Sequence, residues 1–163
     1  PRSTRLSKGP EQSGGFGSYL APIDRFVAHQ ATGRYPRAME SLVELSVPAA
    51  PSQVALVRSA TAAICAGADF TLDALDDLQL AVDEACAVAI ADAAPDARLD
   101  VCWRISGPEV AVELSCRSRS GSPVATNTFA WTVLTALVDR VESSVADGLL
   151  HITLRAHGIG TAA

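Results

Sequence analysis

A helical pattern from Thr71 to about Ala93 constrains the fold of this chain more than any other feature. Apolar residues recur there at the spacing of one helix face, and the expected inner stripe comprises Leu72, Leu75, Leu78, Val82, Cys86 and Ala89. Thr71 is a suitable N-cap, aspartates in the first turns favour a helix N-terminus, and Pro95 stops the helix. We therefore expect one long helix with a single face in the core.

The segments around this helix predict the fold class. Strand patterns are expected over residues 42–47, 99–105, 109–114, 141–145 and 149–156, and two further helices are expected from Ser52 to Gly67 and over 129–138. Asp147-Gly148 is a strong hairpin turn. The order strand–helix–helix–strand–strand–helix–strand–strand predicts an α/β (α+β) two-layer sandwich with a mixed, mostly antiparallel sheet and helices on one face. A doubly wound parallel sheet is not expected.

The overall composition narrows the function classes. Hydrophobic residues make up 48% of the 163 residues and charged residues 19%, which is enough apolar material for a core. No apolar run is long enough for a membrane-spanning helix, and no secretory signal is evident, so we expect a cytoplasmic protein without membrane contact. The net charge of −5 argues against a sequence-independent nucleic-acid binder and suits a basic protein partner.

The chain divides into two parts of different charge. Residues 1–38 contain six Lys/Arg against two Asp/Glu and are rich in Ser, Gly and Pro, which predicts a flexible N-terminal extension. Residues 39–163 contain seven Arg against sixteen Asp/Glu and hold every regular pattern but one short helical turn, so we expect them to form the folded domain.

The cysteines and histidines give no metal-site spacing. Cys65, Cys86, Cys102 and Cys116 form no C-x-x-C pair, and the three histidines are too far apart for a local site. Cysteines among apolar neighbours are usually small buried hydrophobes, which is the expectation here. A redox sensor, in which cysteine oxidation controls partner release, is an alternative.

Glu84 is the strongest single candidate for a catalytic residue. Its helical neighbours at three and four residues on either side are apolar: Leu80, Ala81, Ala87 and Val88. A carboxylate in such surroundings has a raised pKa when buried and can act as a general base. The alternative is that Glu84 is a good helix former at the edge of the inner stripe.

The segment Leu78-Gln79-Leu80-Ala81-Val82-Asp83-Glu84-Ala85-Cys86 resembles the second helix of the GHKL-type ATPases, in their RsbW-like anti-sigma-factor branch. Residues 129–139 are similar to the corresponding helix of a mycobacterial member, and the element order matches over about residues 41–157. The resemblance implies a GHKL (Bergerat-type) fold and a stress-response regulator that binds an alternative sigma factor. It also implies release by a STAS-type anti-anti-sigma protein and a homodimer.

The departures from the family motifs concern nucleotide binding. The family has an Asn four residues after the Glu as a magnesium ligand, and this chain has Val88. The family's adenine-reading Asp falls near Cys116 or Arg117, and Phe129 and Trp131 replace the phosphate-binding glycines. We expect these aromatics to lie in the core and fill the pocket. The nucleotide site is then degenerate, Glu84 is a vestigial base, and no cofactor or metal binds.

An active enzyme is the rival reading. In that alternative, ATP and magnesium bind a diverged pocket around Glu84, and the protein phosphorylates a serine of its anti-anti-sigma partner. Nucleotide-dependent thermal stabilisation separates this reading from a pure binding protein.

Arg58 is the expected partner-binding residue. It is the only basic residue between Met39 and Asp96, and a lone guanidinium on an acidic domain is a suitable bidentate anchor for a carboxylate. The resemblance places it where sporulation-type members have an arginine that contacts both the sigma factor and the anti-anti-sigma protein. The alternatives are an intramolecular pair with a nearby aspartate or plain solvation. Arg117 and Arg119 are expected to lie in a solvated loop.

Overall fold

The computed structural model describes residues 41–66 and 68–158. The expected extension over residues 1–38 and its boundary at Met39 lie outside the described residues. The elements are β1 (Ser41–Pro48), the 3-10 helix η1 (Pro51–Gln53), α2 (Val54–Cys65), α3 (Leu72–Ala91), β2 (Arg98–Ser106), β3 (Glu109–Arg117), α4 (Phe129–Leu137), β4 (Arg140–Ala146) and β5 (Leu149–His157). The predicted order of strands and helices is confirmed.

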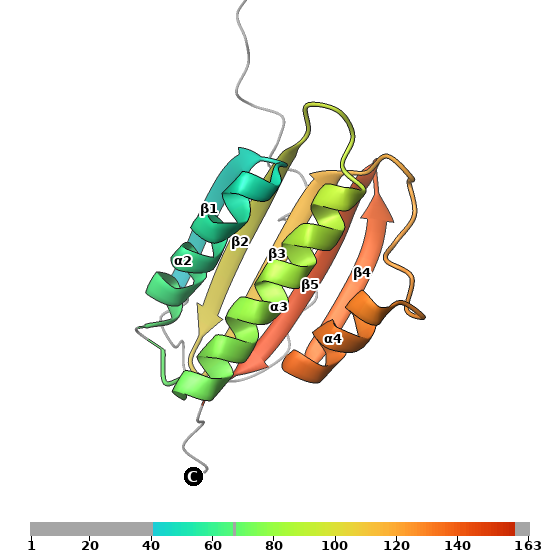
Figure 1. The fold of residues 1–163 in the computed structure, drawn as a ribbon. Helices are drawn as coiled ribbons and strands as arrows, with labels where there is room; N and C mark the ends of the chain where they lie inside the picture. Colours follow the sequence, from blue (N-terminus) through green and yellow to red (C-terminus); the bar gives the residue numbers. More distant parts are fainter. Residues whose placement is uncertain (1–40, 67, 159–163) are drawn as a thin grey trace, which may run out of the picture. The chain divides into compact units, whose positions relative to one another are not determined.

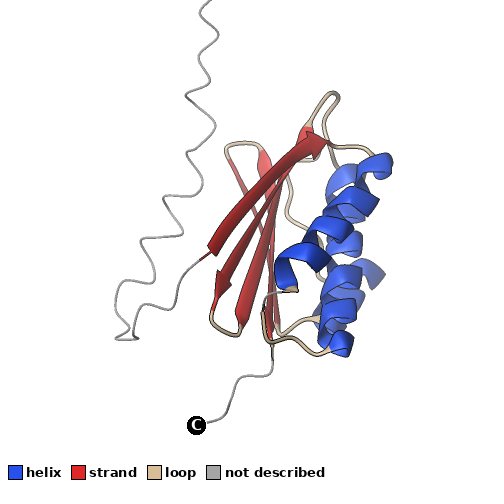
Figure 2. Cartoon of the chain, turned by 90° about the vertical axis from the view of Figure 1, so that its left-hand side faces the viewer, coloured by secondary structure: helices blue, strands red, loops and turns tan. Residues whose placement is uncertain are grey.

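The strands form one sheet with the order β1-β2-β3-β5-β4, and α2, α3 and α4 cover one of its faces (Figures 1 and 2). Every described pairing is antiparallel, so the sheet is simpler than the mixed one expected. Asp147 (φ 53°) and Gly148 (φ 76°) both adopt the left-handed conformation that a tight hairpin between β4 and β5 requires. The predicted two-layer fold is confirmed.

The core lies between the sheet and the helices. Its large members include Trp103 on β2, Leu114 on β3, Leu134 on α4 and Leu154 on β5, all fully buried. Thr61 on α2 is the buried polar residue of this core within the described residues; its hydroxyl donates to the Val57 carbonyl at 3.0 Å and accepts from Trp103 Nε1 at 3.1 Å. These hydrogen bonds offset the cost of removing the buried hydroxyl from water.

The helix α3 begins as predicted. The Thr71 hydroxyl accepts a hydrogen bond from the Ala74 amide at 3.0 Å, which caps the first turn. The buried positions of the helix are Leu78, Ala81, Val82, Ala85, Cys86 and Ala89.

Two details of the predicted helices are wrong. Leu72 is 80% exposed, because at 100° per residue it lies more than a quarter of a turn from the centre of the buried stripe. Ser52 is not an N-cap: it lies inside η1, and α2 begins after Gln53 without a side-chain cap.

Within the described residues, no helix combines the length and the apolarity that crossing a bilayer would require.

Candidate functional site

Arg58 and Asp83 join the exposed side of α2 to α3. Nη1 of Arg58 lies 3.0 Å from Oδ2 of Asp83, and the Arg58 side chain is 50% exposed whereas that of Asp83 is 21% exposed. The helix α3 lies between α2 and α4 on the sheet (Figure 1), and the ion pair places Asp83 on the side of α3 that faces α2. The structure therefore contains the intramolecular ion pair that the sequence offered as an alternative, and it also leaves the Arg58 side chain half exposed.

Asp83 is the constrained member of this pair. Its Oδ1 atom is buried and has no hydrogen-bond partner within the part of the chain that the structure describes. Burial raises the pKa of the Asp83 carboxyl, and the Arg58 charge acts in the opposite direction. Asp83 was not predicted from the sequence by number; the signal that points to it is a lone arginine on α2, which needs a counter-ion from the neighbouring helix.

Glu84 follows Asp83 on α3 and points about 100° further round the helix. Its side chain is partly buried, and it makes no hydrogen bond or ion pair with any residue of ranges 41–66 and 68–158. Val88, one turn later, is also partly buried and packs against the core. The structure thus places the candidate base beside a side chain without an oxygen atom, as the spacing indicated.

A second polar cluster closes the C-terminal end of α3. The Asp92 carboxylate accepts hydrogen bonds from the hydroxyls of Ser118 and Ser120 and from the Ser120 amide. These hydrogen bonds, the Ser118 bond first, hold the pKa of Asp92 below its usual value. Arg119 donates from Nη2 to the Ala91 carbonyl at 2.9 Å.

The expectation that Arg117 and Arg119 lie in a solvated loop is only partly right. Arg117 and Arg119 are exposed as expected, but the segment is fixed to the end of α3 by Asp92, a residue that sequence analysis did not single out. The resemblance places the family's adenine-reading acid near Cys116 or Arg117, of which Cys116 is buried and Arg117 is exposed. Neither a cysteine nor an arginine side chain offers a carboxylate to an adenine.

The expectation that Phe129 lies in the core is wrong. Phe129 is 82% exposed, whereas Leu134 is fully buried. Phe129 is the first residue of α4, and Leu134 lies 140° further round the helix, so the two point to nearly opposite sides. Trp131 is partly buried, and its amide donates to the Thr128 hydroxyl that caps α4. Phe129 therefore fills no pocket in the folded domain.

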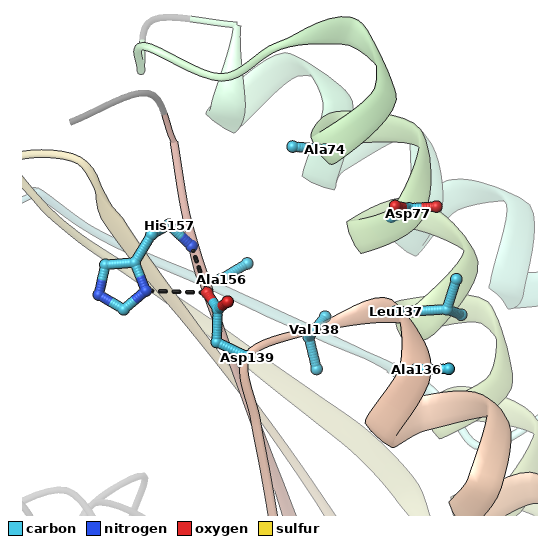
Figure 3. Close-up of a pocket in the computed structure, with 8 residues that line it drawn as sticks. All are labelled: Ala74, Asp77, Ala136, Leu137, Val138, Asp139, Ala156 and His157. Carbon is cyan, nitrogen blue, oxygen red and sulfur yellow. Dashed lines mark hydrogen bonds and ion pairs between the residues drawn. The ribbon is translucent and has the colours of Figure 1, made fainter. Parts of the chain in front are cut away.

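A pocket of about 270 Å³ lies at the other end of α3 (Figure 3). Its residues come from the start of α3, the end of α4, the link from α4 to β4 and the end of β5: Ala74, Asp77, Ala136, Leu137, Val138, Asp139, Ala156 and His157. Oδ2 of Asp139 accepts a hydrogen bond from the His157 backbone amide at 2.9 Å and lies 2.8 Å from Nδ1 of the His157 ring. None of the predicted site residues lines this pocket.

The four cysteines are free thiols, of which Cys65, Cys86 and Cys116 are buried and Cys102 is partly buried. Burial raises the pKa of Cys65 to about 11 and that of Cys86 to about 12, and it also raises the pKa of Cys102 and Cys116. Because the thiolate is the reactive form, this burial counts against the redox-sensor alternative.

Comparison with known proteins gives consistent matches. Residues 47–155 match the histidine kinase-like ATPase domain family. Two curated relatives, both named anti-sigma-F factor RsbW, from Mycobacterium tuberculosis strains CDC 1551 / Oshkosh and H37Rv, are 40% identical over 121 residues, which are 70% of this chain and 72% of each relative.

A solved structure shares the fold. It contains the RsbU and RsbW domains of Rv1364c from Mycobacterium tuberculosis, superimposes with a TM-score of 0.59 and is 18% identical. The match covers 72% of this chain and 32% of that longer chain. At this identity the likeness establishes the fold alone.

Proposed function

Since the chain belongs to the histidine kinase-like ATPase family, in its RsbW-like anti-sigma-factor branch, we propose that it binds an alternative sigma factor and blocks its access to RNA polymerase core. The observation that supports this most directly is the half-exposed side chain of Arg58 on α2. It offers a positive, hydrogen-bonding anchor on an otherwise acidic domain, which suits a carboxylate of a largely basic partner.

We propose further that sigma-factor binding needs no nucleotide. The residues at the family's nucleotide positions do not fit ATP and magnesium: Val88 has no ligand oxygen, Cys116 is buried, and Phe129 has a side chain where the family has a glycine. The Asp92 carboxylate, just beyond the end of α3, already accepts three hydrogen bonds from the loop after β3. These observations support a degenerate nucleotide site.

In this proposal, release of the sigma factor and formation of a homodimer follow the pattern of the family. An anti-anti-sigma protein of the STAS type competes for the surface around Arg58 and frees the sigma factor, and the anti-sigma factor acts as a homodimer. The support for both statements is the family membership.

Titration of purified alternative sigma factors from the source genome tests the proposal. One of them should bind with the same affinity in the presence and absence of ATP and magnesium, as measured by calorimetry. Arg140 provides a matched control, because it is an exposed arginine paired with Glu142 on the distant edge strand β4. Arg140→Ala should bind like the wild type, and the absence of binding by every sigma factor would refute the proposal.

One observation favours a second function, that of an ATP-dependent serine kinase. Glu84 is partly buried and unpaired among the described residues, so its carboxylate oxygens are free to accept a proton. ATP and magnesium would then raise the melting temperature, and phosphate transfer to an anti-anti-sigma protein would be lost in Glu84→Ala. Without either effect, the binding function alone remains.

A further inference from the structure

We propose that Asp83 is a positioning residue that fixes the Arg58 guanidinium so that one edge stays available for a carboxylate of the partner. The binding consequence of this inference rests on the proposed function, whereas the positioning itself is a property of the free protein. The contact that supports it is the 3.0 Å approach of Arg58 Nη1 to Asp83 Oδ2.

The guanidinium is a planar group that presents more than one hydrogen-bonding edge. Asp83 engages Nη1, and neither Nη2 nor Nε of Arg58 has a partner among residues 41–66 and 68–158. The edge formed by Nε and Nη2 can therefore donate two parallel hydrogen bonds to an incoming carboxylate while the contact with Asp83 persists. The two carboxylates share the arginine instead of competing for it.

Asp83 suits this role because it is the less exposed member of the pair. Its side chain is 21% exposed against 50% for Arg58, and its Oδ1 atom is buried without a partner in the described part of the chain. A carboxylate held between two packed helices has little freedom to turn towards water. Ordering a long arginine side chain before binding reduces the entropy that is lost when the partner arrives.

The geometry also predicts why arginine is required at position 58. A lysine there could keep an ion pair with Asp83, because a single ammonium can approach Oδ2. It would lack a second planar edge for the carboxylate of the partner. Arg58→Lys should therefore preserve the stability of the fold but lose most of the affinity that Arg58 provides.

The first measurement uses the free protein. The order parameter of the Arg58 Nε–H group, from NMR relaxation, should fall in Asp83→Ala and fall less in Asp83→Asn, which retains an acceptor oxygen. Glu142→Ala serves as the control, because it removes the carboxylate that pairs with Arg140 on β4. An Arg58 order parameter that does not change in Asp83→Ala would overturn the positioning role whether or not a partner binds.

The second measurement is calorimetric titration with the purified sigma factor that the wild type binds. Asp83→Ala should weaken binding by about tenfold, and in the Arg58→Ala background it should have little further effect, because coupled residues are not additive. Tighter binding by Asp83→Ala would show that Asp83 competes with the partner, and additive losses would show independent roles; either result overturns the inference. If no sigma factor binds the wild type, the proposed function fails, and the order parameter still decides the role of Asp83.

Discussion

Trp103 on β2 donates its indole N–H to the hydroxyl of Thr61 on α2 at 3.1 Å, and both side chains are fully buried. This hydrogen bond joins α2 to strand β2 of the sheet within the core. It therefore also fixes α2, the helix on which Arg58 lies three residues before Thr61.

Thr61→Val should lower the free energy of unfolding by about 1–3 kcal/mol, because it leaves the buried indole N–H without an acceptor. Chemical denaturation monitored by fluorescence measures this change. Trp103→Phe removes the donor, so adding Thr61→Val to that variant should cost clearly less than it does alone. Equal costs in the two backgrounds would mean that the hydrogen bond contributes nothing.

Arg58→Ala should weaken sigma-factor binding by at least about 1–2 kcal/mol, as expected for an interface anchor. Calorimetry with the purified sigma factor measures the loss, and Arg140→Ala is the control, because Arg140 lies on the edge strand β4 at the far end of the sheet from β1. An affinity unchanged in Arg58→Ala would remove this residue from the binding surface.

The loop after β3 should detach from α3 in acid. The hydrogen bonds of Ser118 and Ser120 hold the folded-state pKa of Asp92 below the ordinary value of 3.8. The stabilisation is therefore fully present above pH 3.8 and is lost as the pH falls through the lower folded pKa. Hydrogen exchange of the Ser120 amide, which donates to Asp92, measures the docking.

At neutral pH, Asp92→Ala should speed that exchange by about tenfold or more, since a charge-assisted hydrogen bond is lost. Asp76→Ala is a suitable control, because Asp76 is an exposed aspartate near the other end of the same helix. Equal exchange in Asp92→Ala and the wild type would show that the loop is held by other contacts.

Thiol-labelling rates in the native state should follow burial. Cys86 and Cys65, whose pKa values are raised to about 12 and about 11, should react slowest, and the partly buried Cys102 should react fastest. Mass spectrometry after timed alkylation resolves the four sites, and unfolded protein gives the reference rate. Rapid labelling of Cys86 in the folded protein would restore the redox-sensor alternative.

Two apolar residues of α4 should differ sharply in their effect on stability. Leu134→Ala should cost about 2–5 kcal/mol, because it opens a cavity in the core. Phe129→Ser should change the free energy of unfolding by no more than about 0.5 kcal/mol, since the ring is exposed. Thermal denaturation of the two variants measures both values, and a large loss in Phe129→Ser would contradict the exposed position.

The order of elements, the Thr71 cap and the Asp147-Gly148 hairpin were predicted because each depends on local chemistry. Periodicity, capping and turn preferences act within a few residues, so they can be read along the chain. The same reasoning correctly identified a helix beginning at Phe129 but placed its aromatic ring on the wrong side.

By itself, the sequence determined the two-layer fold and the absence of an oxygen ligand at Val88, because these depend on residue type and spacing. Only the tertiary structure decided that Asp83 on α3 pairs with Arg58 on the neighbouring helix α2, that Asp92 holds the loop after β3, and that Phe129 points to solvent. These relations join residues far apart in the chain or depend on which side of a helix meets the sheet. Packing determines both kinds of relation. Each helix rotates about its axis until its apolar stripe is buried against the sheet, and this rotation fixes which side chains meet and which point to solvent.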